Sequence, residues 1–117
     1  MDFNQNKPIY LQIADSICEK ILSGEYLPDE RILSVRELGI SLGVNPNTIA
    51  RVYEHLQGME VIYNKRGIGY FVAPSAPERI LEKQREEFLR EELPAVARKM
   101  KLLGVPIEVL GEMMGRE

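Results

Sequence analysis

Hydrophobic residues recur at helical spacing in two segments near the start of the chain. One segment spans residues 8–23 and is ended by Gly24, and its apolar positions share one face: Tyr10, Ile13, Ala14, Ile17 and Ile21. The other segment ends at Leu42 and opens with Ser34-Val35-Arg36-Glu37, a capping box. We therefore predict two helices. Gly39 inside the second one is expected to cost about 1 kcal/mol relative to alanine.

A tight turn and a third helix follow. Leu42-Gly43 is typical of a helix end, because glycine readily adopts the left-handed conformation. Asn45 is a good N-cap, and Pro46 suits a first turn, where a backbone N–H has no partner. Over residues 46–59 the apolar positions again recur at helical spacing: Ile49, Val52, Tyr53 and Leu56. This pattern predicts a helix-turn-helix, whose second helix presents its polar start to a DNA major groove.

Residues 61–72 predict a β-hairpin. Val61 and Tyr63 occupy alternate positions before the tip, and Tyr70 and Val72 do so after it. The tip, Lys65-Arg66-Gly67-Ile68-Gly69, combines two cations with two glycines. A hairpin directly after a recognition helix is a wing, and such a tip suits a narrow minor groove or its flanking phosphates. A short strand at 31–33 is predicted to pair with it.

The composition changes after Val72. Residues 74–77, Pro-Ser-Ala-Pro, are predicted to break the strand and form a linker. Residues 78–92 alternate Glu with Lys and Arg, as on a solvated helix, and Pro94 should kink that helix or begin a new one. From Leu93 a richer apolar stripe runs to Gly104, and a last helix starts at Val105-Pro106.

Two short helices cannot bury this apolar stripe within one chain. Exposed apolar surface of this kind predicts a partner, most simply a second copy. The candidate dimerisation residues are Phe88, Leu89, Leu93, Val96, Met100, Leu103, Ile107, Leu110 and Met114. We thus expect a mostly α fold with a small β-hairpin wing: a winged helix-turn-helix over 1–73, a linker over 74–77 and a helical dimerisation domain over 78–117.

Several motifs occur in order: Pro8-x-Tyr10-x-Gln12-Ile13, Gly24-x-Tyr26-x-Pro28, Ser34-x-Arg36-x-Leu38, Leu42-Gly43-Val44-Asn45-Pro46-Asn47-Thr48, Arg51-x-Tyr53, Leu56 and Gly67-x-Gly69-x-Phe71-Val72. Across residues 7–73 they resemble the N-terminal DNA-binding domain of GntR-family transcriptional regulators. The remainder is similar to the YtrA subfamily by its length and helical character. The resemblance implies a bacterial transcription regulator, most often a repressor.

The chain departs from the family pattern at four positions. Asp29 and Glu60 stand where the family usually has Gly, Leu33 where it has Pro, and Gly39 where it has Ala. These positions shape turns and packing, so the departures bear on local geometry more than on function.

The motifs and the resemblance together select the residues expected to contact double-stranded DNA. They are Ser34, Arg36, Asn45, Pro46, Asn47, Thr48, Arg51, Lys65, Arg66 and Gly67. We expect residues 45–51 to enter the major groove, Arg36 to hold the backbone and the wing tip to reach the minor groove. Structural alternatives exist for some of them: Asn47 and Thr48 could cap the helix, and Arg51 could pair with Glu54.

The overall charge is unusual for a DNA-binding protein. The net charge is −3, whereas such proteins are usually basic. From Arg31 to Ala73, however, five cations stand against three anions. We therefore expect a local cationic patch on a mildly acidic body, with modest affinity per subunit, which makes dimerisation important.

Other classes of protein find little support. Cys18 is the only cysteine and His55 the only histidine, so no metal site or Cys/His nucleophile is expected. No phosphate-binding loop or serine elbow occurs, and we predict neither an enzyme nor a cofactor. No run approaches the ~18 apolar residues needed to span a membrane. The absence of a signal-like start and of disulfide pairs favours the cytoplasm.

The sequence therefore predicts a transcriptional regulator that binds a pseudo-palindromic operator as a homodimer. One alternative is a winged helix used as a protein-interaction module, favoured by the acidic composition. Another is an architectural DNA binder without sequence preference. A small effector at the dimer interface or linker is left open, but no residue identifies one, and the short tail leaves little room for a ligand cavity of ~300 Å³.

Overall fold

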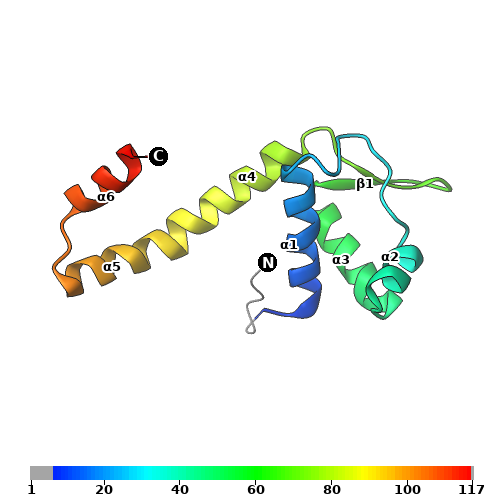
Figure 1. Ribbon diagram of the computed structural model, residues 1–117. Coiled ribbons are helices and arrows are strands. Elements are labelled where there is room, and N and C mark those ends of the chain that lie inside the picture. Colours follow the sequence, from blue (N-terminus) through cyan, green and yellow to red (C-terminus); the bar gives the residue numbers. More distant parts are fainter. Residues whose placement is uncertain (1–6, 117) are drawn as a thin grey trace. The chain divides into compact units, whose positions relative to one another are not determined.

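The computed structural model describes residues 7–116, and its elements follow the predicted order (Figure 1). The bounds are α1 Ile9–Leu22, α2 Val35–Leu42, α3 Pro46–Gly58, β1 Ile62–Lys65, β2 Gly69–Val72, α4 Ala76–Glu87, the π-helical segment η1 Phe88–Glu92, α5 Leu93–Leu103 and α6 Ile107–Gly115. The chain forms two compact units that divide between Leu81 and Glu82. The predicted fold class, mostly α with a hairpin wing, is confirmed.

The core of the first unit forms where α1 and α2 pack on α3 and the hairpin closes one side. The predicted apolar stripe of α3 is entirely buried, and Cys18 lies in the same core as a small apolar side chain. The hydroxyl of Tyr53 donates to the carbonyl oxygen of Leu33, and burial raises the pKa of Tyr53. Because one face of α3 is held in the core, Pro46 and Asn47 of its first turn remain exposed.

The hairpin pairs Ile62 with Val72 and Lys65 with Gly69. Ile62 and Val72 are both buried. The buried face of β1 therefore starts at Ile62, one residue later than predicted. Val61 is also buried, but it lies just before β1. The predicted strand at 31–33 is reduced to a single bridge, Arg31 to Phe71. It stays short because the chain turns sharply just before it and α2 is capped just after it.

Glycine ends two helices in the same way. Gly43 after α2 has φ 66°, the left-handed conformation predicted for it, and Gly104 after α5 has φ 70°. In each turn the N–H of the following valine, Val44 or Val105, reaches back to a carbonyl of the last helical turn. Both turns end one helix and lead directly into the next.

Three departures from the family pattern have a structural role. Gly39 is buried, and a Cβ there would lie 2.9 Å from the carbonyl oxygen of Val44. The predicted loss of helix stability at Gly39 is therefore offset, because the missing side chain lets the carbonyl of Val44 approach the helix closely. Asp29 and Glu60 adopt left-handed φ values of 64° and 61°, at the positions where glycine is usual.

The predicted linker at 74–77 does not form a separate segment. Ala76 and Pro77 belong to the first turn of α4. Ala76 and Ile80 are buried in the core of the first unit, and Arg79 pairs with Glu60 at 2.6 Å. The start of α4 is thus part of the winged unit, because its apolar side chains complete that core.

Pro94 alters the helix that precedes it, as predicted. It lies in the first turn of α5, and the N–H of Leu93 bonds the carbonyl of Phe88, a π-helical pattern. Proline has no N–H and its ring crowds the carbonyl four residues earlier, so one wide turn accommodates it.

The second unit has no core of its own among the described residues. No residue of α5 or α6 is buried. Leu102 is 84% exposed, although the sequence pattern does not select it as an interface residue. The predicted excess of apolar surface is therefore present.

Candidate nucleic-acid interface

The start of α3 is a capped, exposed helix end. The side-chain oxygen of Asn45 accepts from the N–H of Asn47 at 2.8 Å, and Pro46 occupies the first turn. Asn45, Pro46 and Asn47 are exposed, and Thr48 is half-buried. The Asn45 oxygen is thus used for capping, while the side chains of Asn47 and Thr48 remain at the surface of the first turn.

The start of α2 is held by the predicted capping box. The Ser34 hydroxyl accepts from the N–H of Glu37 at 3.1 Å, and the Glu37 carboxylate accepts from the N–H of Ser34 at 3.0 Å. This bonding lowers the pKa of the Glu37 carboxyl. Arg36 lies between them, exposed at the positive end of the helix dipole. A phosphate approaching here would meet both a cation and free helix N–H groups.

The wing tip is a four-residue turn. The N–H of Ile68 bonds the carbonyl of Lys65 at 2.9 Å, and Gly67 has φ 81°, a conformation that favours glycine. Lys65 lies over the ring of Phe71 at 4.8 Å, and Arg66 is exposed. The turn therefore holds one cation against the strand face and leaves the other free to reach a ligand.

Two residues near the predicted site were not selected from the sequence. Arg31 counted only towards the local charge, yet its guanidinium crosses the wing at Gly69, where a Cβ would lie 2.9 Å from its Nε. Tyr10 was assigned to packing, and it also lies under the guanidinium of Arg51, 4.0 Å from its ring centroid. Neither contact follows from sequence spacing, because both join segments far apart in the chain.

The base of the wing is braced by aromatic rings. Tyr63 stacks on Phe71 with 5.6 Å between centroids, and the Tyr63 hydroxyl donates to Asp29 at 2.9 Å. That hydrogen bond raises the pKa of Tyr63. The left-handed turn at Asp29 is thereby tied to β1, which supports the orientation of the hairpin.

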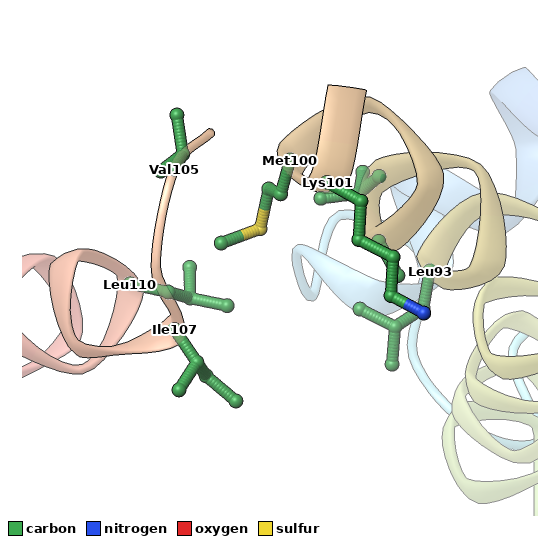
Figure 2. Close-up of a pocket in the computed structure, with 8 residues that line it drawn as sticks. Leu93, Met100, Lys101, Val105, Ile107 and Leu110 are labelled. Carbon is green, nitrogen blue, oxygen red and sulfur yellow. The ribbon is translucent and has the colours of Figure 1, made fainter. Parts of the chain in front are cut away.

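The second unit contains an apolar cleft between α5 and α6. Its volume is about 410 Å³, which corrects our expectation that the tail has little room for a cavity. Figure 2 shows Met100, Ile107 and Leu110 pointing into it and Lys101 beside it. The other lining residues are Leu93, Val96, Ala97 and Val105. The cleft offers apolar contact almost exclusively.

Two other kinds of site are absent from the part of the chain that the structure describes. Across 7–116, no three His, Cys, Asp or Glu side chains converge as metal ligands would. In the same part of the chain, no helix has the length and apolar character to cross a membrane. The surface features that remain are polar helix starts, a cationic hairpin tip and an apolar cleft.

A two-helix motif with a polar second-helix start, followed by a basic-tipped hairpin, defines a winged helix-turn-helix DNA-binding protein. Residues 9–72 match the model of "Bacterial regulatory proteins, gntR family". The chain belongs to this family of DNA-binding transcriptional regulators, which are not enzymes.

Two relatives from Bacillus subtilis are similar over nearly their whole length. The HTH-type transcriptional regulator YhcF is 39% identical, over 94% of this chain and 89% of its own. The HTH-type transcriptional repressor YtrA is 30% identical, over 96% of this chain and 85% of its own. The similarity therefore includes the tail as well as the winged unit.

Solved structures agree with the fold. A GntR-family regulator from Bacteroides thetaiotaomicron is 48% identical, with a TM-score of 0.82 over 93% of this chain and 95% of its own. The DNA-binding domain of AraR, solved with an operator, is 33% identical, with a TM-score of 0.55 over 62% of this chain and 86% of its own. The second match concerns the winged unit in a DNA-bound relative.

Proposed function

We propose that this regulator is a homodimeric repressor that recognises a pseudo-palindromic operator. The observation that carries the proposal is the exposed, capped start of α3 next to a cationic wing, both held by one buried core. In this arrangement each subunit reads one half-site. A two-fold dimer requires inverted half-sites, whose spacing depends on the tail.

The proposed major-groove contacts come from the first turns of α3. Asn47 and Thr48 offer short hydrogen-bonding side chains that suit base edges. Arg36, at the exposed start of α2, is assigned to a backbone phosphate. Such contacts position the protein without reading sequence, so their removal lowers affinity for all duplexes.

The proposed minor-groove contact is the wing tip. Arg66 is exposed, and the turn around Gly67 presents backbone without a side chain in the way. Narrow minor grooves carry an enhanced negative potential that attracts arginine. The local excess of cations over residues 31–73 supports this assignment despite the acidic whole chain.

The proposed dimer interface is the apolar surface of the tail. Five of the nine predicted interface residues line the cleft: Leu93, Val96, Met100, Ile107 and Leu110. The exposed apolar residues of α6 provide matching surface in a second copy, since a two-fold interface uses the same patch twice. The repressor role is supported by similarity to YtrA, a repressor. A regulator of this kind would act in the cytoplasm.

Selection of sites from a random duplex library tests this proposal. We expect enrichment of an inverted repeat bound by a dimer. Arg36→Ala and Arg66→Ala should each reduce the slope of log K against log salt by about 1, because each removes one cation that neutralises a phosphate. Arg85→Ala is the matched control, because Arg85 lies on α4 in the second unit and is not among the predicted contacts.

The two alternatives give different results in the same experiment. An architectural binder would retain random duplexes as well as any selected site. A protein-interaction module would show no salt-dependent DNA affinity at all. Equal slopes for Arg36→Ala, Arg66→Ala and Arg85→Ala would contradict the assignment of these contacts even if the protein binds DNA.

A further inference from the structure

We propose that Tyr10 is a positioning residue that holds the Arg51 guanidinium ready for a DNA phosphate, an inference that rests on the proposed DNA-binding mode. Tyr10 lies in the first turn of α1 and Arg51 in the second turn of α3, two helices that pack directly on each other. The Arg51 guanidinium carbon is 4.0 Å from the centroid of the Tyr10 ring. A cation this close to an aromatic face is attracted by the ring quadrupole.

The ion pair that would neutralise Arg51 does not form. Glu54 stands three residues further along α3, at a spacing that permits such a pair. Within the described part of the chain, however, no carboxylate lies within salt-bridge distance of Arg51, and its one specific contact is with Tyr10. The positive charge is therefore retained at the surface and not cancelled by a neighbour.

The stacked geometry suits a second ligand. The guanidinium is planar and carries its N–H donors around its edge, so a ring on its face leaves those donors available. A phosphate oxygen accepts such donors strongly. Arg51 is exposed and Tyr10 half-buried, which places the cation outside and the ring beneath it.

The ring itself is held in place. His55, one turn beyond Arg51 on α3, meets the Tyr10 ring edge-on, with centroids 6.0 Å apart and planes at 84°. Tyr10 also packs against the buried core. A free arginine side chain must lose rotamer freedom when it binds, whereas one already stacked on a fixed ring has lost part of it beforehand.

Binding to a mixed-sequence duplex at low salt tests the proposal, because phosphate contacts need no particular sequence. Tyr10→Leu should weaken binding about two- to fivefold per subunit, as for an exposed cation–π contact. Tyr10→Phe keeps the ring and should bind like the wild type. Tyr10→Leu should have little further effect when combined with Arg51→Ala.

Tyr26→Leu is the matched control. It removes a half-buried ring that lies under Lys20, a residue of α1, at 5.5 Å from the Lys20 ammonium group. Tyr26→Leu should leave DNA affinity unchanged. Loss of affinity in Tyr10→Phe equal to that in Tyr10→Leu would assign the effect to the hydroxyl and overturn the positioning role.

A second measurement does not depend on the stability of the leucine variant. In nuclear magnetic resonance spectra, the δ-methylene protons of Arg51 should show an upfield ring-current shift that persists in Tyr10→Phe and when DNA is added. Arg51→Lys keeps the charge but loses the planar stack, and should weaken binding about as much as Tyr10→Leu does. Absence of the shift, or full affinity in Arg51→Lys, would overturn the proposal. Failure of the wild type to bind any duplex would instead refute the proposed function.

Discussion

At the scale of single residues, Gly39 shows how a local cost can serve a tertiary contact. Alanine has the better helix propensity by about 1 kcal/mol. At this buried position, however, a Cβ would lie 2.9 Å from the carbonyl oxygen of Val44, in the turn between α2 and α3. Since that oxygen belongs to backbone, the turn must shift to admit a methyl group.

We therefore predict that Gly39→Ala destabilises the protein by about 1–3 kcal/mol, the range for overpacking. Gly58→Ala is the control, because Gly58 ends α3 with open space around it and should be neutral or stabilising. Urea unfolding of both variants measures the difference. A stable Gly39→Ala variant would contradict the predicted clash.

Glu60 combines a strained backbone with a favourable side-chain contact. Its φ of 61° costs a non-glycine residue about 1–2 kcal/mol. Its exposed ion pair with Arg79 contributes about 0–1 kcal/mol after solvent screening. Glu60→Gly should accordingly raise the free energy of unfolding by about 1 kcal/mol, since the relief of strain exceeds the contribution of the pair.

Glu60→Ala separates the two effects. Alanine keeps the strain and loses the ion pair, so it should lower stability by less than about 1 kcal/mol. The same urea titrations report both variants. If Glu60→Gly proves less stable than the wild type, the ion pair to α4 contributes more than the relief of the strained backbone conformation.

At the scale of elements, the capping box couples α2 to pH. Hydrogen bonds from the backbone N–H and the side chain of Ser34 lower the pKa of Glu37 from its ordinary value of 4.5. A lowered folded-state pKa means that the unfolded state takes up a proton first as the pH falls. Stability from this carboxylate is therefore complete above pH 4.5 and lost as the pH falls through the folded-state pKa.

Glu37→Gln should flatten that part of the acid-unfolding profile. Glutamine can still close the capping box, but it does not titrate. Thermal unfolding measured from neutral pH to about pH 3, roughly one unit below the ordinary carboxyl pKa, gives the dependence of stability on pH. Parallel profiles for the variant and the wild type would show that other carboxylates carry the acid dependence.

At the scale of the whole molecule, the proposed dimer makes the tail essential for DNA binding. Val96 lines the apolar cleft and is 44% exposed in the single chain, so a charge there should not disturb the fold of one subunit. It would have to be buried in a dimer, where an unpaired charge is costly. Val96→Glu is therefore expected to yield monomers with greatly reduced operator affinity.

Arg98→Glu provides the control for this change. Arg98 lies on α5, is exposed and does not line the cleft. The Arg98→Glu variant should therefore remain a dimer. Sedimentation velocity gives the oligomeric state, and a gel shift gives the affinity. A dimeric Val96→Glu protein would place the interface elsewhere.

The helix ends were predicted correctly, because capping and helix termination depend on residues that are close in the sequence. The capping residues Ser34 and Asn45 and the helix-ending Gly43 and Gly104 act within a few residues of themselves. The start of α4 was not predicted, because Pro74 and Pro77 suggest a break, whereas burial of Ile80 in the first core is a tertiary effect. The positions proposed to contact DNA remain predictions, although their exposure is now known.

Periodicity and turn chemistry act over short distances, so the amino-acid sequence predicts the helix-turn-helix, the wing and a tail with more apolar surface than one chain can bury. The packing of the helices is what stacks Arg51 on Tyr10, makes Arg31 cross the wing at Gly69 and starts α4 in the core of the winged unit. These contacts join residues distant in the chain. Their geometry depends on how the helices pack, which no local pattern encodes.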